Sequence, residues 1–170
     1  PVLHNAAYAS YGMTDWHYGR HELQEADLAG FVAGLDDEWR GLSCTMPLKK
    51  AVLEVADEVS PLAERAGVGN TLVRQSDGGW YADNTDVGGL VDALTPHWRG
   101  WERAAVLGGG ATARSALLAL ELLGAKRAVV YARNIDQANT LGAWGIMAGF
   151  KMRVIPEDLA EWPRDVHPVV

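Results

Sequence analysis

A glycine-rich turn has the residue types and spacing of a nucleotide-binding loop. Gly108, Gly110 and Ala113 follow the G-x-G-x-x-G/A pattern, in which the glycines permit a tight turn and a close approach to pyrophosphate. The turn closes an apolar stretch and opens a long helical pattern, whose first amides are free to bind phosphate. We therefore predict a dinucleotide site that also includes Gly109 and Ala111. The alternative is a turn that needs small residues for packing alone.

The end of the next predicted strand indicates which nucleotide is bound. A site for NAD places an acidic residue there to bind the ribose 2′-hydroxyl, whereas this chain has Arg133 followed by Asn134. A guanidinium group can grip phosphate oxygens in pairs, so Arg133 favours the 2′-phosphate of NADP. The alternative is an ordinary solvated arginine at a strand end.

Four further blocks lie upstream of the glycine turn: PVLHNAAY at 1–8, TMPLKK at 45–50, GVGNTL at 67–72 and DNTDVGG at 83–89. Their order and spacing resemble the shikimate dehydrogenase family. Chains of that family carry an S-x-S-P-x-x-H-N opening, a T-x-P-x-K loop, a G-A-x-N-T strand start and an N-T-D-x-x-G helix start. The nucleotide loop follows in the same order. The resemblance covers nearly the whole chain and is more specific than any single motif.

The resemblance implies roles for four residues in these blocks. Lys49 and Asp86 would be the catalytic pair, and Thr45, Asn70 and Asp86 would bind the substrate. The chemistry agrees, because moving hydride from an alcohol carbon to nicotinamide requires removal of the hydroxyl proton, which a lysine beside a carboxylate can take up. Each residue taken singly could equally be a capping residue or a solvated helix start, but the four in family order favour an active site. No metal is expected.

The function implied by the resemblance is the NADP-dependent, reversible reduction of 3-dehydroshikimate to shikimate, in the shikimate pathway of aromatic amino-acid biosynthesis. One alternative is a quinate/shikimate or aminoshikimate dehydrogenase, including one that uses NAD. Another is a catalytically inactive ligand-binding fragment, because the serines that precede Pro1 in the family and its C-terminal glutamine and tyrosine are missing, so truncation at both ends is expected. Gln137 stands where many relatives have a second basic residue, which predicts a weaker preference for NADP.

Composition disfavours several other classes of protein. The net charge of −7, without a large basic block, disfavours a nucleic-acid partner, and no apolar run approaches the roughly 20 residues that span a bilayer. The single cysteine, Cys44, fits a reducing cytoplasm and is expected to be a small buried strand residue rather than a nucleophile. The expected partners are a small-molecule substrate and, in a homodimer, a second copy of the chain.

Hydrophobic periodicity predicts the elements that position these residues. In the first half we expect helices over residues 2–11 and 26–35, strands over 15–23 and 41–46, a helix with Pro47 in its first turn, a hairpin around Asp77-Gly78-Gly79, and a helix from about Asp86. His17 and His21 have helical metal-pair spacing but lack a third ligand, so they are interpreted as surface residues.

A break near Pro96 is followed by a strand, the glycine turn, a helix and a second strand, which together have the length of one βαβ unit. A helix over 135–150, a strand at 152–156 and the start of another strand at 166–170 complete the predicted order. The predicted fold class is α/β, with a substrate-binding domain over 1–95, an incomplete Rossmann-type NADP-binding domain over 96–170 and the active site between them.

Overall fold

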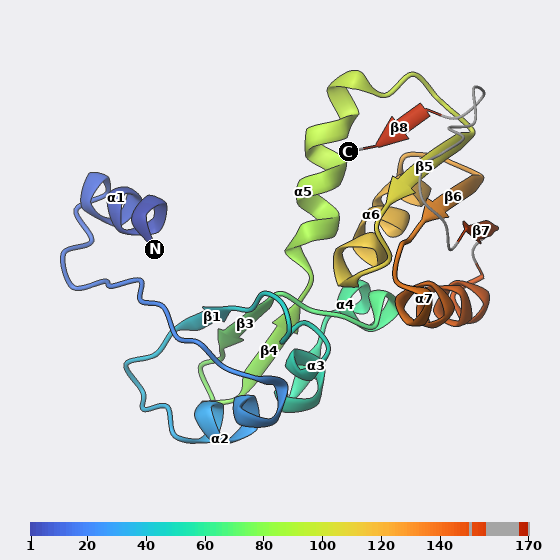
Figure 1. Ribbon diagram of the computed structural model, residues 1–170. Helices are drawn as coiled ribbons and strands as arrows, with labels where there is room; N and C mark the ends of the chain where they lie inside the picture. The colour runs from blue at the N-terminus through green and yellow to red at the C-terminus, as the bar shows by residue number, and fades with distance from the viewer. Residues whose placement is uncertain (150, 156–166, 170) are drawn as a thin grey trace.

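The computed structural model describes residues 1–149, 151–155 and 167–169. The described chain is a mixed α/β structure with two four-stranded sheets, each formed by one half of the chain (Figure 1). This confirms the predicted fold class. Over the described ranges, no helix is long and apolar enough to cross a membrane.

The first half of the chain builds a mixed sheet with strand order β1-β3-β4-β2. β1 and β4 are antiparallel to β3, and β2 is parallel to β4. Buried side chains such as Val52, Leu72 and Ala82 form its core. The elements are α1 (Val2–Ser10), η1 (Glu25–Asp27), α2 (Leu28–Ala33), β1 (Gly41–Ser43), α3 (Ala51–Val55), β2 (Glu58–Val59), α4 (Pro61–Ala66), β3 (Thr71–Arg74), β4 (Trp80–Asp83), α5 (Thr85–Leu94) and η2 (Thr95–His97).

The predicted hairpin connects β3 to β4. Gly78 has a φ of +90°, a backbone conformation that favours glycine, and the Gly79 N–H donates to Asp77 Oδ1 at 2.9 Å. This turn chemistry fixes the register in which Thr71 lies opposite Asp83. As a result, the start of β3 and the end of β4 lie side by side, and the residues that flank them are brought to one edge of the sheet.

The second half builds a parallel sheet with strand order β7-β6-β5-β8. Its elements are β5 (Arg103–Leu107), α6 (Ala111–Leu122), β6 (Arg127–Tyr131), α7 (Ile135–Met147), β7 (Met152–Ile155) and β8 (His167–Val169). Val106, Leu117, Val130 and Leu141 are among the buried residues of its core. The β5-α6-β6 order confirms the predicted βαβ unit, with the glycine turn between β5 and α6.

Helix α5 joins the two halves, because it leaves the end of β4 and packs along α6 (Figure 1). A shared apolar cluster includes Val68 and Val87 from the first half and Leu118 from the second. Beside it, the buried Asn84 side chain caps α5 and donates to Ser115 Oγ of α6 at 2.9 Å. A buried polar pair of this kind specifies how the two helices meet, since either group would otherwise lose its partner in the interior.

The strand predicted over residues 15–23 is wrong, because this segment forms no strand. At Tyr18 the backbone bonds to a side chain instead: the Tyr18 N–H donates to Asn5 Oδ1 at 2.8 Å, and the Tyr18 carbonyl accepts from Asn5 Nδ2 at 3.0 Å. The Asn5 amide thus makes with Tyr18 the two hydrogen bonds that a neighbouring strand would make there. His17 and His21 are exposed, as predicted for surface residues.

The position of Pro47 also differs from the prediction. Residues 46–50 form a turn in which the Leu48 N–H donates to the Thr45 carbonyl at 2.7 Å, and α3 begins only at Ala51. Lys49 therefore lies on a turn rather than within a helix. Near the end of the chain α7 stops at Met147, before the predicted 150, and the outer residues of the last two predicted strands (156, 166 and 170) fall outside the described residues.

Candidate active site

Lys49 and Asp86 form an ion pair between two separate elements. Lys49 lies on the turn that follows β1, and Asp86 lies in the first turn of α5, where the helix dipole favours a negative charge. Lys49 Nζ donates to Asp86 Oδ2, and the two side chains are only 12% and 26% exposed. Partial burial makes the interaction stronger than a surface ion pair.

Asn70 holds the other oxygen of the Asp86 carboxylate. Its Nδ2 donates to Asp86 Oδ1 at 2.7 Å, while its own Oδ1 accepts from Thr71 Oγ1 at 2.9 Å, from the Thr85 N–H at 3.0 Å and from Thr85 Oγ1 at 3.1 Å. These donors fix which end of the amide faces Asp86, because only an oxygen can accept from them. Both carboxylate oxygens of Asp86 are therefore occupied by donors.

These side chains lie close to the end of β1, the start of β3 and the end of β4. Asn70 directly precedes β3, and its backbone N–H donates to the Asp83 carbonyl at 3.0 Å. Its carbonyl accepts from the Cys44 N–H at 2.7 Å. Thr45 is next along the chain and exposed, and within the described residues its side chain makes no hydrogen bond to Lys49, Asn70 or Asp86. The structure thus brings three of the four predicted residues into direct contact and places Thr45 at the start of the Lys49 turn.

Lys49 also reaches the second half of the chain. Its Nζ donates to Thr112 Oγ1 at 3.2 Å, across 63 positions of sequence. Thr112 is the second residue of α6, directly after the glycine turn. The contact joins the predicted catalytic pair to the predicted nucleotide loop. Thr112 was not among the predicted site residues, although its hydroxyl within the turn sequence GGGAT was a signal that could have identified it.

The glycine turn is shaped by three glycines that differ in what surrounds them. Gly108 has a φ of +107°, and its N–H donates to the Tyr131 carbonyl of β6 at 2.8 Å. A Cβ on Gly109 would lie 2.9 Å from the Ala132 Cβ, whereas a Cβ on Gly110 would meet nothing within 4 Å. Gly109 is therefore needed for packing, whereas the space around Gly110, at the N-terminus of α6, is open. The turn fits a dinucleotide.

Arg133 and Asn134 lie just beyond the end of β6, which pairs with β5 up to Leu107 and so ends level with the glycine turn. Asn134 Oδ1 caps α7 by accepting from the backbone N–H groups of Asp136 and Gln137, each at 3.0 Å. Arg133 is exposed, and no other described residue pairs with its guanidinium group. An unengaged cation at this position suits a phosphate ligand, which supports the predicted NADP site.

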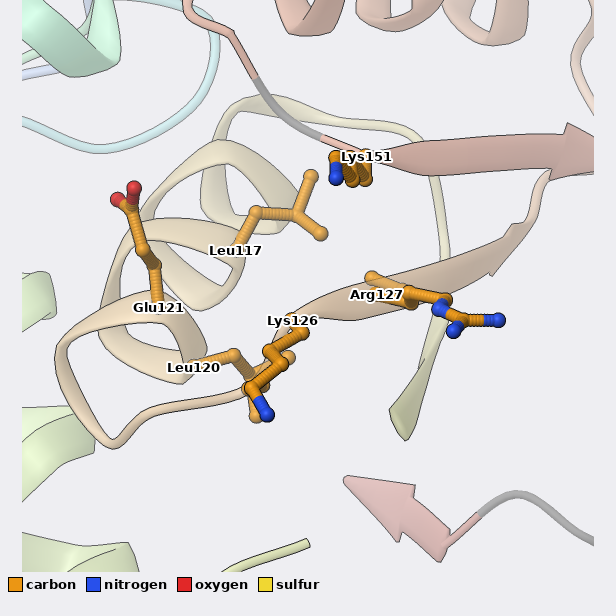
Figure 2. A pocket seen from close by; sticks show the side chains of 8 residues that line it. Leu117, Leu120, Glu121, Lys126, Arg127 and Lys151 are labelled. Atoms are coloured by element: carbon orange, nitrogen blue, oxygen red, sulfur yellow. The ribbon is translucent and has the colours of Figure 1, made fainter. Parts of the chain in front are cut away.

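Two other features lie outside this arrangement. Cys44 is buried, as predicted, but it lies just beyond the end of β1, because that strand stops at Ser43 and not at the predicted residue 46. Burial raises the pKa of its thiol to about 11, so it is a poor nucleophile at neutral pH. A small pocket lies between α6 and β6 (Figure 2), lined by Leu117, Leu120, Glu121, Ala125, Lys126, Arg127, Ala128 and Lys151. None of the predicted site residues lines it, since it lies at the opposite end of β6 from Arg133. Over the described residues, no group of His, Cys, Asp and Glu side chains could hold a metal.

Comparison with known proteins shows which family this chain resembles in sequence and fold. Residues 1–72 match the family model of the shikimate dehydrogenase substrate binding domain. The NADP(+) shikimate dehydrogenase of Caulobacter vibrioides is 40% identical over 146 residues, which are 83% of this chain and 51% of that protein. The chain is thus similar in sequence to this shikimate dehydrogenase over 83% of its own length. It spans about half the length of this curated relative.

Solved structures of the family have the same fold. A shikimate 5-dehydrogenase from Mycobacterium fortuitum superposes with a TM-score of 0.79 at 41% identity, over 95% of this chain and 59% of that one. The shikimate 5-dehydrogenase of Thermus thermophilus, in complex with NADP(H) and shikimate, gives a TM-score of 0.71 at 31% identity, over 92% of this chain and 57% of that one. These likenesses confirm the resemblance drawn from the sequence blocks.

Proposed function

We propose that the protein is an NADP-dependent shikimate dehydrogenase that reduces 3-dehydroshikimate to shikimate and catalyses the reverse oxidation. The observation that carries the proposal is the position of Lys49, whose ammonium group contacts Asp86 on one side and Thr112, beside the glycine turn, on the other. The Lys49 ammonium group, a proton donor, thereby lies between the proposed substrate-binding residue Asp86 and the proposed nucleotide loop. The relationship to NADP(+) shikimate dehydrogenases supports this assignment.

Lys49 would move the proton in this reaction. Its ammonium group has three hydrogens, of which one is donated to Asp86 and one to Thr112, so the third is available to the substrate. The nicotinamide of NADP, when bound, supplies or accepts the hydride at carbon. In the reductive direction Lys49 Nζ gives a proton to the carbonyl oxygen, and in the oxidative direction it takes the proton from the hydroxyl. Asp86 would orient the ammonium group and stabilise its charge.

Thr45, Asn70 and Asp86 would bind the substrate hydroxyls and carboxylate. One hydrogen of Asn70 Nδ2 is donated to Asp86, and the second is available to a substrate oxygen. The exposed Thr45 hydroxyl lies at the start of the same turn as Lys49. A cyclic polyol with a carboxylate presents the acceptors and donors that such a set of groups can match. We assign this role to the part of the chain over residues 1–95.

Residues 96–170 would hold NADP. Gly108, Gly109, Gly110 and Ala111 would receive the pyrophosphate, and Arg133 the 2′-phosphate. Asn134, as the cap of α7, would shape the turn that carries Arg133. We further propose that the protein works in the cytoplasm, as a homodimer.

An assay of nicotinamide reduction tests the proposal. Shikimate and quinate are each offered with NADP and with NAD to the complete protein, and the absorbance of reduced nicotinamide is followed. Shikimate with NADP is expected to give the highest kcat/KM. A higher kcat/KM for quinate, or equal use of both nucleotides, would replace this assignment with a quinate-type or NAD-using enzyme. No reduction with any pair would favour a ligand-binding role.

A further inference from the structure

Thr112 is the residue through which the two halves of the site are in polar contact. It follows the glycine turn at the second position of α6, and its Oγ1 accepts from Lys49 Nζ at 3.2 Å. Lys49 is anchored on its other side by Asp86 and, through Asp86, by Asn70. The chain of hydrogen bonds therefore runs from the first sheet to the start of α6 without interruption.

The hydroxyl of Thr112 can serve two partners at once. A threonine hydroxyl accepts through its oxygen and donates through its single hydrogen. Lys49 occupies the accepting side, and among the described residues nothing takes up the hydrogen that the hydroxyl could donate. Thr112 is exposed, and it stands beside the first-turn amides of α6 and the open space in front of Gly110. That is the space in which the proposed function requires a pyrophosphate, whose oxygens are acceptors.

We propose that Thr112 is a positioning residue that couples Lys49 to the bound nucleotide: its hydroxyl accepts from the Lys49 ammonium and donates to a pyrophosphate oxygen. The proposal rests on the proposed function for the identity of the nucleotide. It follows that the hydroxyl becomes a better donor when its oxygen accepts from a cation, because hydrogen bonds in a chain polarise one another. Nucleotide affinity and the placement of Lys49 then depend on each other through one side chain.

Substitution of Thr112 separates the hydroxyl from the volume of the side chain. Thr112→Val keeps the shape and removes the hydroxyl, whereas Thr112→Ser keeps the hydroxyl and removes only a methyl group. Thr112→Val is expected to lower kcat and to weaken NADP binding by about tenfold each, which is the lower end of the scale of one hydrogen bond to a charged group. Thr112→Ser is expected to stay within about twofold of the unchanged protein in both quantities, given how little it changes. Thermal melting of both variants checks that they fold.

A double-mutant cycle on nucleotide binding tests the coupling itself. The dissociation constant of NADP is measured by titration calorimetry, without substrate, for the unchanged protein, Thr112→Val, Lys49→Met and the double variant. The proposal predicts that Thr112→Val weakens binding at least about threefold more when Lys49 is present than when it is replaced. Additive effects, or unchanged binding in Thr112→Val, would overturn it. Because this readout needs no turnover, it stands even where the assay of nicotinamide reduction gives no activity with shikimate.

Discussion

Exchanging the side chains of Asn70 and Asp86 gives a sharp prediction about the site. In Asp86→Asn the new amide can present only one oxygen, yet Asn70 Nδ2 and Lys49 Nζ both donate to this side chain. Asn70 cannot turn over to help, since its oxygen accepts from Thr71 and Thr85. One N–H group must then face another donor. Loss of a hydrogen bond to a charged group costs about 1.5–3 kcal/mol, so kcat/KM should fall by roughly ten- to a hundredfold or more.

The double variant Asn70→Asp, Asp86→Asn should recover part of that loss. An aspartate at position 70 can accept from Thr71 and Thr85 with one oxygen and from the new amide at position 86 with the other, while the oxygen of that amide accepts from Lys49. Every donor then faces an acceptor again. The negative charge has moved from position 86, which contacts Lys49, to position 70, which contacts position 86. The single variant Asn70→Asp should be impaired, because it sets two carboxylates against each other.

The assay is kcat/KM for shikimate oxidation with NADP, measured for the unchanged protein, both single variants and the double variant. The double variant should be at least about tenfold more active than the product of the single effects predicts, which corresponds to a coupling of about 1.4 kcal/mol. A double variant as poor as that product would refute this hydrogen-bond arrangement around Asp86, whatever the single variants show. Thermal melting of all four proteins separates lost activity from lost folding.

Two further predictions concern the glycine turn and the buried thiol. Gly109→Ala should lower the free energy of unfolding by about 1–3 kcal/mol, as overpacking does, because its Cβ would lie 2.9 Å from the Ala132 Cβ. Gly110→Ala should melt at the temperature of the unchanged protein yet bind NADP more weakly. Equal melting temperatures for the Gly109→Ala and Gly110→Ala variants would contradict this difference. Cys44 should resist alkylation in the folded protein at neutral pH. Burial raises its pKa from 9.0 to about 11. The stabilising contribution of the buried, protonated thiol is therefore complete below pH 9.0 and is lost as the pH rises toward 11. Equal alkylation rates in the folded and unfolded protein would contradict the burial of Cys44.

The sequence predicted correctly those elements whose structure depends on contacts between neighbouring residues. The βαβ unit around Gly108 and the hairpin at Asp77-Gly78 depend on turn chemistry between neighbouring residues, and both are found in the structure. Lys49, Asn70 and Asp86 were identified by their blocks, and the hairpin register explains why the last two meet: it sets the start of β3 beside the end of β4.

Tertiary contacts account for what the sequence did not predict. Residues 15–23 alternate as a strand does, but the backbone of Tyr18 is satisfied by the side chain of Asn5, 13 positions away. The bond between Lys49 and Thr112 joins residues 63 positions apart, and the buried pair of Asn84 and Ser115 joins residues 31 positions apart. No local pattern encodes such contacts, and the last two depend on how α5 packs against α6.

The most direct test of the proposed function compares two neighbouring lysines. Lys49 is bound to Asp86 and Thr112, whereas Lys50 is exposed and serves as the matched control. We predict that Lys49→Met lowers kcat for NADP-dependent shikimate oxidation by about a hundredfold or more, the typical contribution of a proton-transfer group, while Lys50→Met leaves kcat within about twofold, as expected of a surface substitution. Shikimate oxidation by Lys49→Met at the rate of the unchanged protein would contradict the role assigned to Lys49.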